Sequence, residues 1–244
     1  MLPVRFVASV VVRVRLDCYG VAPMATKRAR GGSLADTLQQ LFDAERTVRA
    51  VHDDLAASDP GPLLEAIAAA VSTAKKERRE EEAGLRFVRL SALLAEQTGD
   101  RAVDLLIDIL GCDVGEGRYA AGEALTELAF DRFKEVALGV ERALTRLPAN
   151  SPALVELPFV LVEVPEPGVA KLLELFLSHQ NAEVVAAAIE AAAEVGDPAI
   201  ARALEKLTKD PRLVSMDDDE GESAEVPLGK LASEALELLV GSGD

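Results

Sequence analysis

Tryptophan is absent from this chain of 244 residues, and aromatic residues together make up only 4% of it. The core must therefore be built mostly from alanine, leucine and valine. Cysteine occurs only twice, at Cys18 and Cys112. Two cysteines cannot form the disulfide framework of a small secreted domain, and they fit a reducing compartment. We therefore expect a cytoplasmic protein.

Positive charge is also scarce. The chain has 26 lysine and arginine residues against 42 aspartate and glutamate residues, and its formal net charge is −16. Such a surface repels the phosphates of nucleic acids and the headgroups of anionic lipids. We therefore expect a protein partner, with a basic surface favoured, and no nucleic acid, membrane or small-molecule substrate.

Long apolar runs are missing as well. The most apolar segment lies near the N-terminus and is cut by Arg13 and Arg15, so it is too broken for a secretory signal and too short for a transmembrane helix. Met24 begins a more ordinary cytoplasmic start, and we interpret residues 1–23 as a start site assigned too far upstream. A poor export signal and a docking arm stay open as alternatives. We expect residues 1–33 to form an N-terminal extension without fixed structure.

The residues that are present favour helices. Apolar residues make up 49% of the chain, and most of the others are good helix formers. Similar segments begin at Glu123 ("EALTELA"), Glu190 ("EAAAEVG") and Glu234 ("EALELLV"), with a weaker copy at Glu156. The intervals are 33, 34 and 44 residues. Periods of this size are typical of repeat architectures.

A second helix precedes each recurring segment. The segments 100–110, 166–176 and 197–207 share an acidic residue at the start and one apolar stripe. We therefore predict a unit of helix A, a short loop, helix B and a tight turn. Gly99 and Gly196 are expected to end the preceding helices in a left-handed conformation.

Small residues recur on the predicted B helices. Ala120, Ala121, Ala124 and Gly122 belong to the first of these helices, and a similar alanine cluster follows at 186–192. We expect these residues to let neighbouring helices lie close together, with Gly122 doing so at some cost in helix propensity. Stacked pairs would then bury a continuous core.

The segments "RYAAGEALTEL" and "VVAAAIEAAAEVGDPAIARALEKL" resemble the HEAT-repeat family, especially the short bacterial repeats of the phycobilisome-lyase type. The resemblance implies an all-α fold, an α-solenoid of stacked antiparallel helix pairs. Residues 34–59 are interpreted as a capping helix and 60–244 as about four to five helix pairs. Pro158 departs from the pattern and is expected to kink or end its helix. An acidic loop is expected to be inserted at 215–227.

The search for chemistry finds little. His52 and His179 lack the repeated His-Glu pairs of a metal-dependent hydroxylase. Cys112 has acidic neighbours, which oppose a reactive thiolate. We therefore predict no catalytic, cofactor-binding or metal site, and a protein that is not an enzyme. An enzyme of the bilin-lyase type stays open as an alternative. A DNA alkylation-repair glycosylase is disfavoured, because it needs a cationic face and aromatic residues.

The run "DDDEGES" interrupts a repeat. Oxygen ligands at Asp217, Asp219 and Glu222 suggest calcium, but their spacing does not match an EF-hand. A disordered acidic loop and a docking contact for a basic partner are the other interpretations.

By analogy with the family, the B helices line the concave side of the solenoid. We predict a non-catalytic scaffold or adaptor for protein–protein interaction, with an acidic inhibitor or immunity protein that binds a basic partner as the alternative. The repeat style suggests a bacterial source. The candidate partner-binding residues are Tyr119, Glu123, Glu127, Glu190, Glu194, Glu234, Glu237, Asp217, Asp218 and Asp219. The glutamates among them could equally serve only to solvate the surface.

Overall fold

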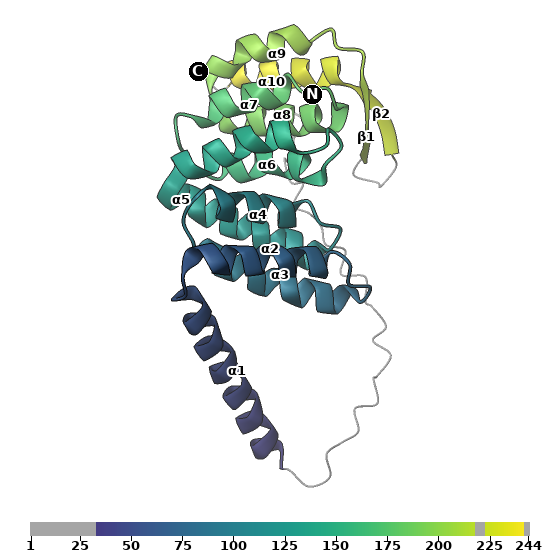
Figure 1. Ribbon diagram of the computed structural model, residues 1–244. Helices are drawn as coiled ribbons and strands as arrows, with labels where there is room; N and C mark the ends of the chain where they lie inside the picture. Colours follow the sequence, from purple (N-terminus) through teal and green to yellow (C-terminus); the bar gives the residue numbers. More distant parts are fainter. Residues whose placement is uncertain (1–32, 218–222, 242–244) are drawn as a thin grey trace. The chain divides into compact units, whose positions relative to one another are not determined.

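The structure, a computed structural model, describes residues 33–217 and 223–241 (Figure 1). The chain divides into two compact units, Met1–Leu63 and Leu64–Asp244. Most of the predicted N-terminal extension lies outside the described residues. Ser33, its last residue, is the N-cap of the first helix.

The first unit contains helix α1 (Leu34–Ala56). A capping box fixes its start, because the Ser33 hydroxyl accepts from the Asp36 backbone N–H while the Asp36 carboxylate accepts from the Ser33 backbone N–H. None of the residues of α1 is buried. Its role as a cap on the repeat array stays a prediction.

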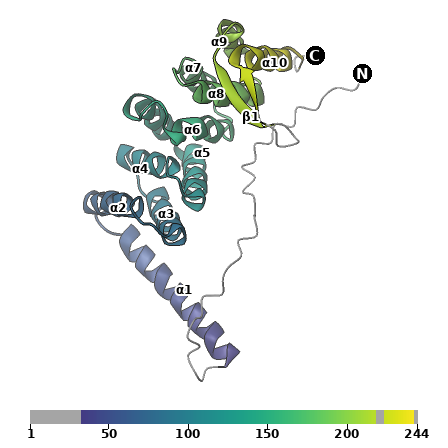
Figure 2. The ribbon, with the colours of Figure 1, turned by 90° about the vertical axis from the view of Figure 1, so that its right-hand side faces the viewer.

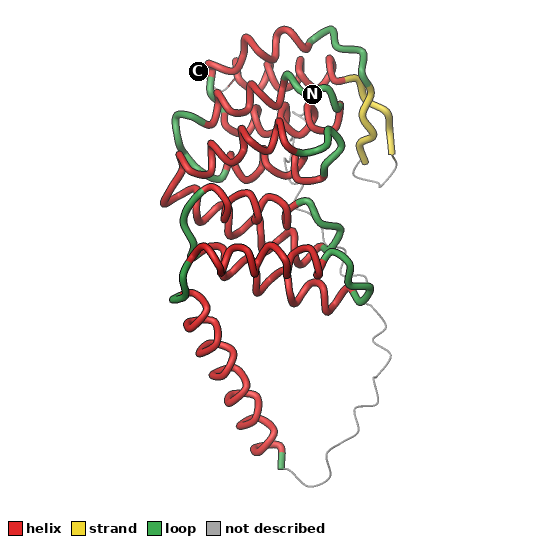
Figure 3. The backbone as a smooth tube through the Cα atoms, viewed as in Figure 1, coloured by secondary structure: helices red, strands yellow, loops and turns green. Residues whose placement is uncertain are grey.

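The second unit is a helical solenoid, which confirms the predicted all-helical fold of stacked antiparallel helix pairs (Figures 1 and 3). From Leu64 to residue 241, A and B helices alternate along the chain and form two layers (Figure 2). The B layer contains α3, the first half of α5, α6, α8 and α10, and the A layer contains α2, α4, the second half of α5, α7 and α9. The bounds are α2 Pro60–Ala74, α3 Glu80–Ala95, α4 Asp100–Leu110, α5 Gly115–Arg146, α6 Pro152–Val162, α7 Val169–Leu177, α8 Ala182–Val195, α9 Ala201–Leu207 after a short 3₁₀ turn (Pro198–Ile200), and α10 Leu228–Gly241.

Helix α5 serves both layers. It runs from Gly115 to Arg146 with a kink at Arg132, whose φ of −140° and ψ of 49° are not helical. The Arg132 guanidinium donates to the backbone oxygen of Gln97 at 2.9 Å. The kink therefore turns the chain from the B layer into the A layer while Arg132 binds the loop that follows α3.

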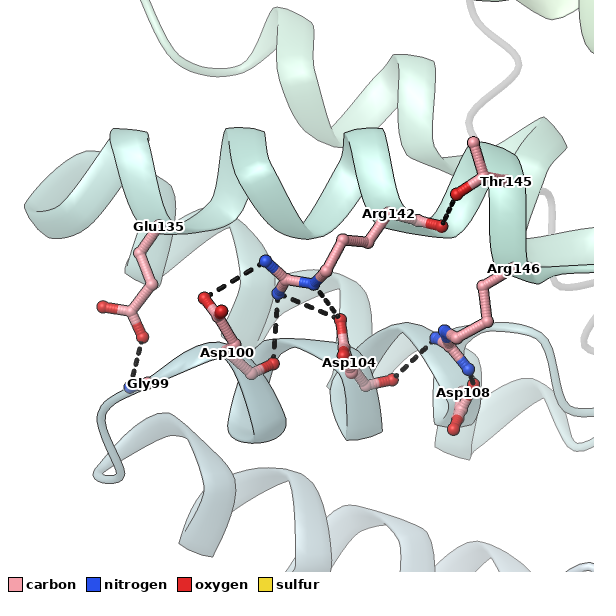
Figure 4. A network of polar contacts seen from close by, with 8 residues as sticks. All are labelled: Gly99, Asp100, Asp104, Asp108, Glu135, Arg142, Thr145 and Arg146. Atoms are coloured by element: carbon pink, nitrogen blue, oxygen red, sulfur yellow. Dashed lines mark hydrogen bonds and ion pairs between the residues drawn. The ribbon is translucent and has the colours of Figure 1, made fainter.

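Polar contacts join the two neighbouring A helices α4 and α5 (Figure 4). Arg142 lies 3.1 Å from carboxylate oxygens of both Asp100 and Asp104, and Arg146 lies 2.7 Å from Asp108. The acids are spaced four residues apart, so they lie on one face of α4. The two arginines are also one helical turn apart, so each can face an acid of α4. These ion pairs help to orient the two helices relative to each other.

Close helix approach depends on two glycines of α5. A Cβ on Gly117 would lie 2.8 Å from Cβ of Phe87, and one on Gly139 would lie 2.4 Å from Cγ1 of Val103. The expectation for Gly122 was wrong, because a Cβ there would meet only Leu110 Cδ1 at an ordinary 3.7 Å. The close contacts lie at Gly117 and Gly139 instead, which the sequence pattern did not reveal.

The structure also tests the expected roles of Gly99, Gly196 and Pro158. Gly196 caps α8 with φ 65° and ψ 17°, which confirms the predicted left-handed cap. Gly99 also has a positive φ of 97°, but it precedes α4 and does not cap α3, which ends at Ala95. Pro158 does not end its helix, because α6 continues to Val162 while Pro158 is buried within the core.

The predicted acidic loop at 215–227 is largely a β-hairpin, which corrects the expectation (Figure 3). Strands β1 (Leu213–Asp217) and β2 (Ser223–Pro227) pair antiparallel, with Leu213 opposite Pro227. Val214 is buried and faces Val226 in the register, so alternating apolar residues favour strands here. Residues 218–222, between the strands, lie outside the described residues.

Candidate protein-binding surface

A hollow of about 430 Å³ lies in the B layer between α3 and the first half of α5. Small and apolar side chains make up most of its lining, with a hydroxyl from Ser91 and carboxylates along α5. The lining residues are Val88, Ser91, Ala92, Ala95, Glu116, Tyr119, Ala120, Glu123, Ala124 and Glu127.

The sequence produces this hollow through close packing at one end. Gly84 and Gly117 bring α3 and α5 together, and a Cβ on Gly84 would lie 2.6 Å from a carboxylate oxygen of Glu116. Beyond this contact, the facing residues Ala92, Ala95 and Ala120 have side chains too short to fill the space between the helices. The result is a shallow apolar depression whose floor rests on a rigid helix pair.

The charge around the hollow has one sign. Its lining includes the carboxylates of Glu116, Glu123 and Glu127 and contains no lysine or arginine. Tyr119 stands beside them with 69% of its surface exposed. An exposed aromatic ring beside an apolar depression is a common feature of protein-binding sites.

Ser91 is the unusual residue of the lining. It is only 1% exposed, and within the described residues its hydroxyl has no hydrogen-bond partner. A buried hydroxyl that forms no hydrogen bond costs about 1–3 kcal/mol.

We expect the substitution Ser91→Ala to leave the unliganded protein as stable as before or more stable by about 1 kcal/mol, because it removes an unpaired buried polar group. Chemical denaturation followed by circular dichroism measures this. Ser91→Val, which adds bulk at the same place, provides the control. A loss of more than about 1 kcal/mol in Ser91→Ala would show that the hydroxyl is bonded in the free protein.

The structure brings together three of the predicted partner-binding residues, Tyr119, Glu123 and Glu127, at this hollow. Glu190 and Glu194 lie elsewhere in the B layer, on α8. Burial, followed by repulsion from Glu194, raises the pKa of Glu190.

The remaining predicted residues are not gathered at the hollow. Glu234 on α10 lies 3.7 Å from Lys230, so it already has a partner of opposite charge, and Glu237 is exposed on the same helix. Asp217 ends strand β1. Asp218 and Asp219 lie outside the described residues.

Sequence reasoning missed Ser91, Val88 and Glu116. Glu116 shares a helical face with the predicted residues, since positions 116, 119, 123 and 127 follow a spacing of three or four. That spacing could have indicated Glu116 from the sequence. The sequence indicates Ser91 less clearly, through a hydroxyl within the apolar stripe of "FVRLSALLA".

Cys112 and His179, which the sequence analysis considered for catalysis or metal binding, show no feature of a reactive site. Burial raises the pKa of the Cys112 thiol, which opposes a reactive thiolate. Burial lowers the pKa of His179, whose Nδ1 accepts from the Asn181 backbone N–H at 3.1 Å. No group of three or more histidine, cysteine, aspartate or glutamate residues suited to a metal ion occurs in the described ranges.

A second hollow, of about 410 Å³, lies between the A helices α7 and α9. Its lining combines Glu174 with Lys206 and Arg212. It therefore lacks the uniform charge of the hollow beside Tyr119.

No known protein family and no curated protein matches this chain. Solved structures do match, and designed or engineered proteins are among them. One is a computationally designed armadillo repeat protein for modular peptide recognition, with 16% identity, 84% of this chain and 99% of that chain covered, and a TM-score of 0.34. Another designed armadillo repeat protein shows 17% identity, covers 80% and 94% of the two chains, and has a TM-score of 0.32.

An engineered protein of a structural genomics consortium gives 20% identity, 81% and 92% coverage, and a TM-score of 0.33. Among the described residues, no helix is both long and apolar enough to cross a membrane. By the order and contacts of its own helices, Leu64 to residue 241 form an α-helical repeat solenoid with an acidic-rimmed apolar hollow in its B layer.

Proposed function

We propose that this protein is a non-catalytic scaffold that binds a partner protein through the hollow between α3 and α5. The observation that carries the proposal is the combination of an apolar floor with three carboxylates and no basic residue in the lining. This combination suits a segment with an apolar side chain between lysine or arginine residues.

The acidic lining should increase both the rate of binding to a basic partner and the specificity for it. Opposite charges across an interface accelerate encounter and disfavour acidic partners, and both effects weaken as salt rises. The apolar hollow supplies the part of the affinity that salt does not screen. We therefore expect binding that falls with ionic strength but does not vanish.

Short fluorescein-labelled peptides with a central leucine or phenylalanine between pairs of arginines would test this, with the arginines replaced by glutamates for comparison. Fluorescence anisotropy should detect binding of the basic peptides alone. In the variant Glu123→Lys/Glu127→Lys, the dissociation constant should rise by about tenfold or more, because the rim charge is reversed.

The matched control is Glu141→Lys/Glu205→Lys. It makes the same charge change at two exposed positions, one beyond the kink of α5 and one on α9. Equal loss of binding in both double variants would attribute the affinity to net charge and contradict a specific site. Binding of the acidic peptides would contradict the proposed charge preference.

Retention of partners from a native lysate by the wild type, and their loss in Glu123→Lys/Glu127→Lys, would extend the test to the natural partner. If the retained protein is an enzyme or toxin whose activity falls on binding, the inhibitor alternative is favoured. If its activity is unchanged, the scaffold is favoured.

A further inference from the structure

One face of α5 before its kink consists of acidic and aromatic side chains alone. Between residues 116 and 130, all of them described, five side chains are exposed and the others are buried or half-buried. The exposed ones follow one another at intervals of three or four residues, so they form a continuous ridge along the helix. The residues of this ridge are Glu116, Tyr119, Glu123, Glu127 and Phe130.

The two aromatic rings of the ridge stand far into solvent. Tyr119 is 69% exposed and Phe130 is 57% exposed. Aromatic residues make up only 4% of the chain, so composition alone does not account for two rings among five exposed positions. Packing within the repeat array does not use these ring faces either. They are therefore available to a partner, and exposed aromatic side chains are common anchors at protein interfaces.

Each ring has a carboxylate one helical turn away. Tyr119 is four residues from Glu123, and Phe130 is three residues from Glu127. The two rings are 11 residues apart, which corresponds to about 16 Å along the helix. Both glutamates also line the apolar hollow between α3 and α5. The ridge thus offers two pairs of a ring and a carboxylate beside one apolar depression.

The arginines next to the ridge are engaged with other groups. The Arg118 guanidinium lies 3.8 Å from a carboxylate oxygen of Glu156 on α6, and Arg132 donates to the backbone oxygen of Gln97 at 2.9 Å. Within the described part of the chain, no ion pair involves a carboxylate of the ridge. A cation supplied by a partner would therefore meet no competing cation of this unit.

An aromatic face with a carboxylate one turn away suits arginine better than lysine. The guanidinium group is planar, so it can stack on a ring while the N–H groups at its edge donate to a carboxylate. The lysine ammonium is a compact and strongly hydrated charge, which lacks a flat face for stacking. Charge alone does not distinguish the two residues, whereas the rings do.

We propose that the ridge of α5 selects arginine over lysine in the partner, with Tyr119 and Phe130 as the specificity-determining residues. The pair Tyr119 and Glu123 holds one guanidinium group, and the pair Phe130 and Glu127 holds a second. The apolar side chain between the two arginines enters the hollow. This inference rests on the proposed function, because it names the cation that the acidic lining recognises.

Fluorescence anisotropy with the full chain tests the proposal. It compares the arginine peptides described above with peptides that carry lysine at the same positions and so have the same net charge. For the wild type, the dissociation constant of the arginine peptides should be about tenfold lower than that of the lysine peptides. In the variant Tyr119→Leu/Phe130→Leu, which keeps all three carboxylates, the two dissociation constants should become equal.

Phe42→Leu is the matched control, because it removes a ring that is 53% exposed on α1, in the other compact unit. It should leave the preference for arginine unchanged. Circular dichroism should show all these variants to be folded, since none of the three rings is buried. Tyr119→Trp gives a second readout, because the chain has no other tryptophan. Its fluorescence should change when arginine peptides are added, and much less with lysine peptides.

The outcomes separate this inference from the proposed function. Equal dissociation constants for arginine and lysine peptides in the wild type would overturn the selectivity and leave the binding of basic partners intact. A preference for arginine that persists in Tyr119→Leu/Phe130→Leu would overturn the role of the rings. Failure of both kinds of peptide to bind any of the proteins would contradict the proposed function itself, and the selectivity with it.

Discussion

Phe87→Ala should lower the free energy of unfolding by about 3–5 kcal/mol, the range for removing a large aromatic side chain from a packed core. Phe87 is fully buried in α3, and its ring lies against Gly117 of α5, where the two helices are in close contact. Glycine has no side chain that could move into the space left behind. The cavity would therefore persist beneath the candidate binding surface.

Urea denaturation followed by far-ultraviolet circular dichroism would measure this loss. Phe130→Ala is the matched control, because Phe130 lies in α5 with 57% of its surface exposed. We expect that variant to change stability by less than about 1 kcal/mol. Equal effects of the two substitutions would contradict the packing of α3 against α5.

Gly139→Ala should destabilise the protein by about 1–3 kcal/mol, although helix propensity alone predicts the opposite sign. The added Cβ would lie 2.4 Å from Val103 Cγ1 in α4 and 3.3 Å from Val103 Cβ. Both atoms belong to a β-branched side chain with few alternative rotamers, so the helices would have to move apart. That movement would also lengthen the Arg142 contacts to Asp100 and Asp104.

Gly122→Ala, in the same helix, is the comparison. Its Cβ would make only an ordinary contact, so the substitution should stabilise the protein by up to about 1 kcal/mol through helix propensity. Thermal denaturation of both variants would show opposite shifts of the melting temperature. Val103→Ala should relieve much of the cost of Gly139→Ala in the double variant. Two shifts of the same sign would contradict this account.

The sequence by itself determined the class of fold. Apolar stripes at helical spacing, acidic residues and prolines at helix starts, and the recurrence of "EALTELA" together require helices that cannot bury their faces alone. Local rules of this kind depend on neighbours three or four residues apart. They can therefore be read without the structure, as the left-handed cap at Gly196 confirms.

The spacing of the B-helix glutamates also anticipated part of the candidate site. Tyr119, Glu123 and Glu127 share a helical face, and the structure places all three at one hollow. The strands at 213–217 and 223–227 were missed, because a short hairpin depends on pairing between segments whose composition resembles a loop.

Only the tertiary structure decided which glycines bring helices together and where the hollow lies. Gly117 and Gly139, and not Gly122, lie in close contact with a neighbouring helix, because the rotation of α5 about its axis is set by packing against α3 and α4. The unpaired hydroxyl of Ser91 likewise depends on what surrounds it from other helices. Contacts between residues distant in the sequence depend on the packing of the whole unit, and the local sequence pattern does not contain them.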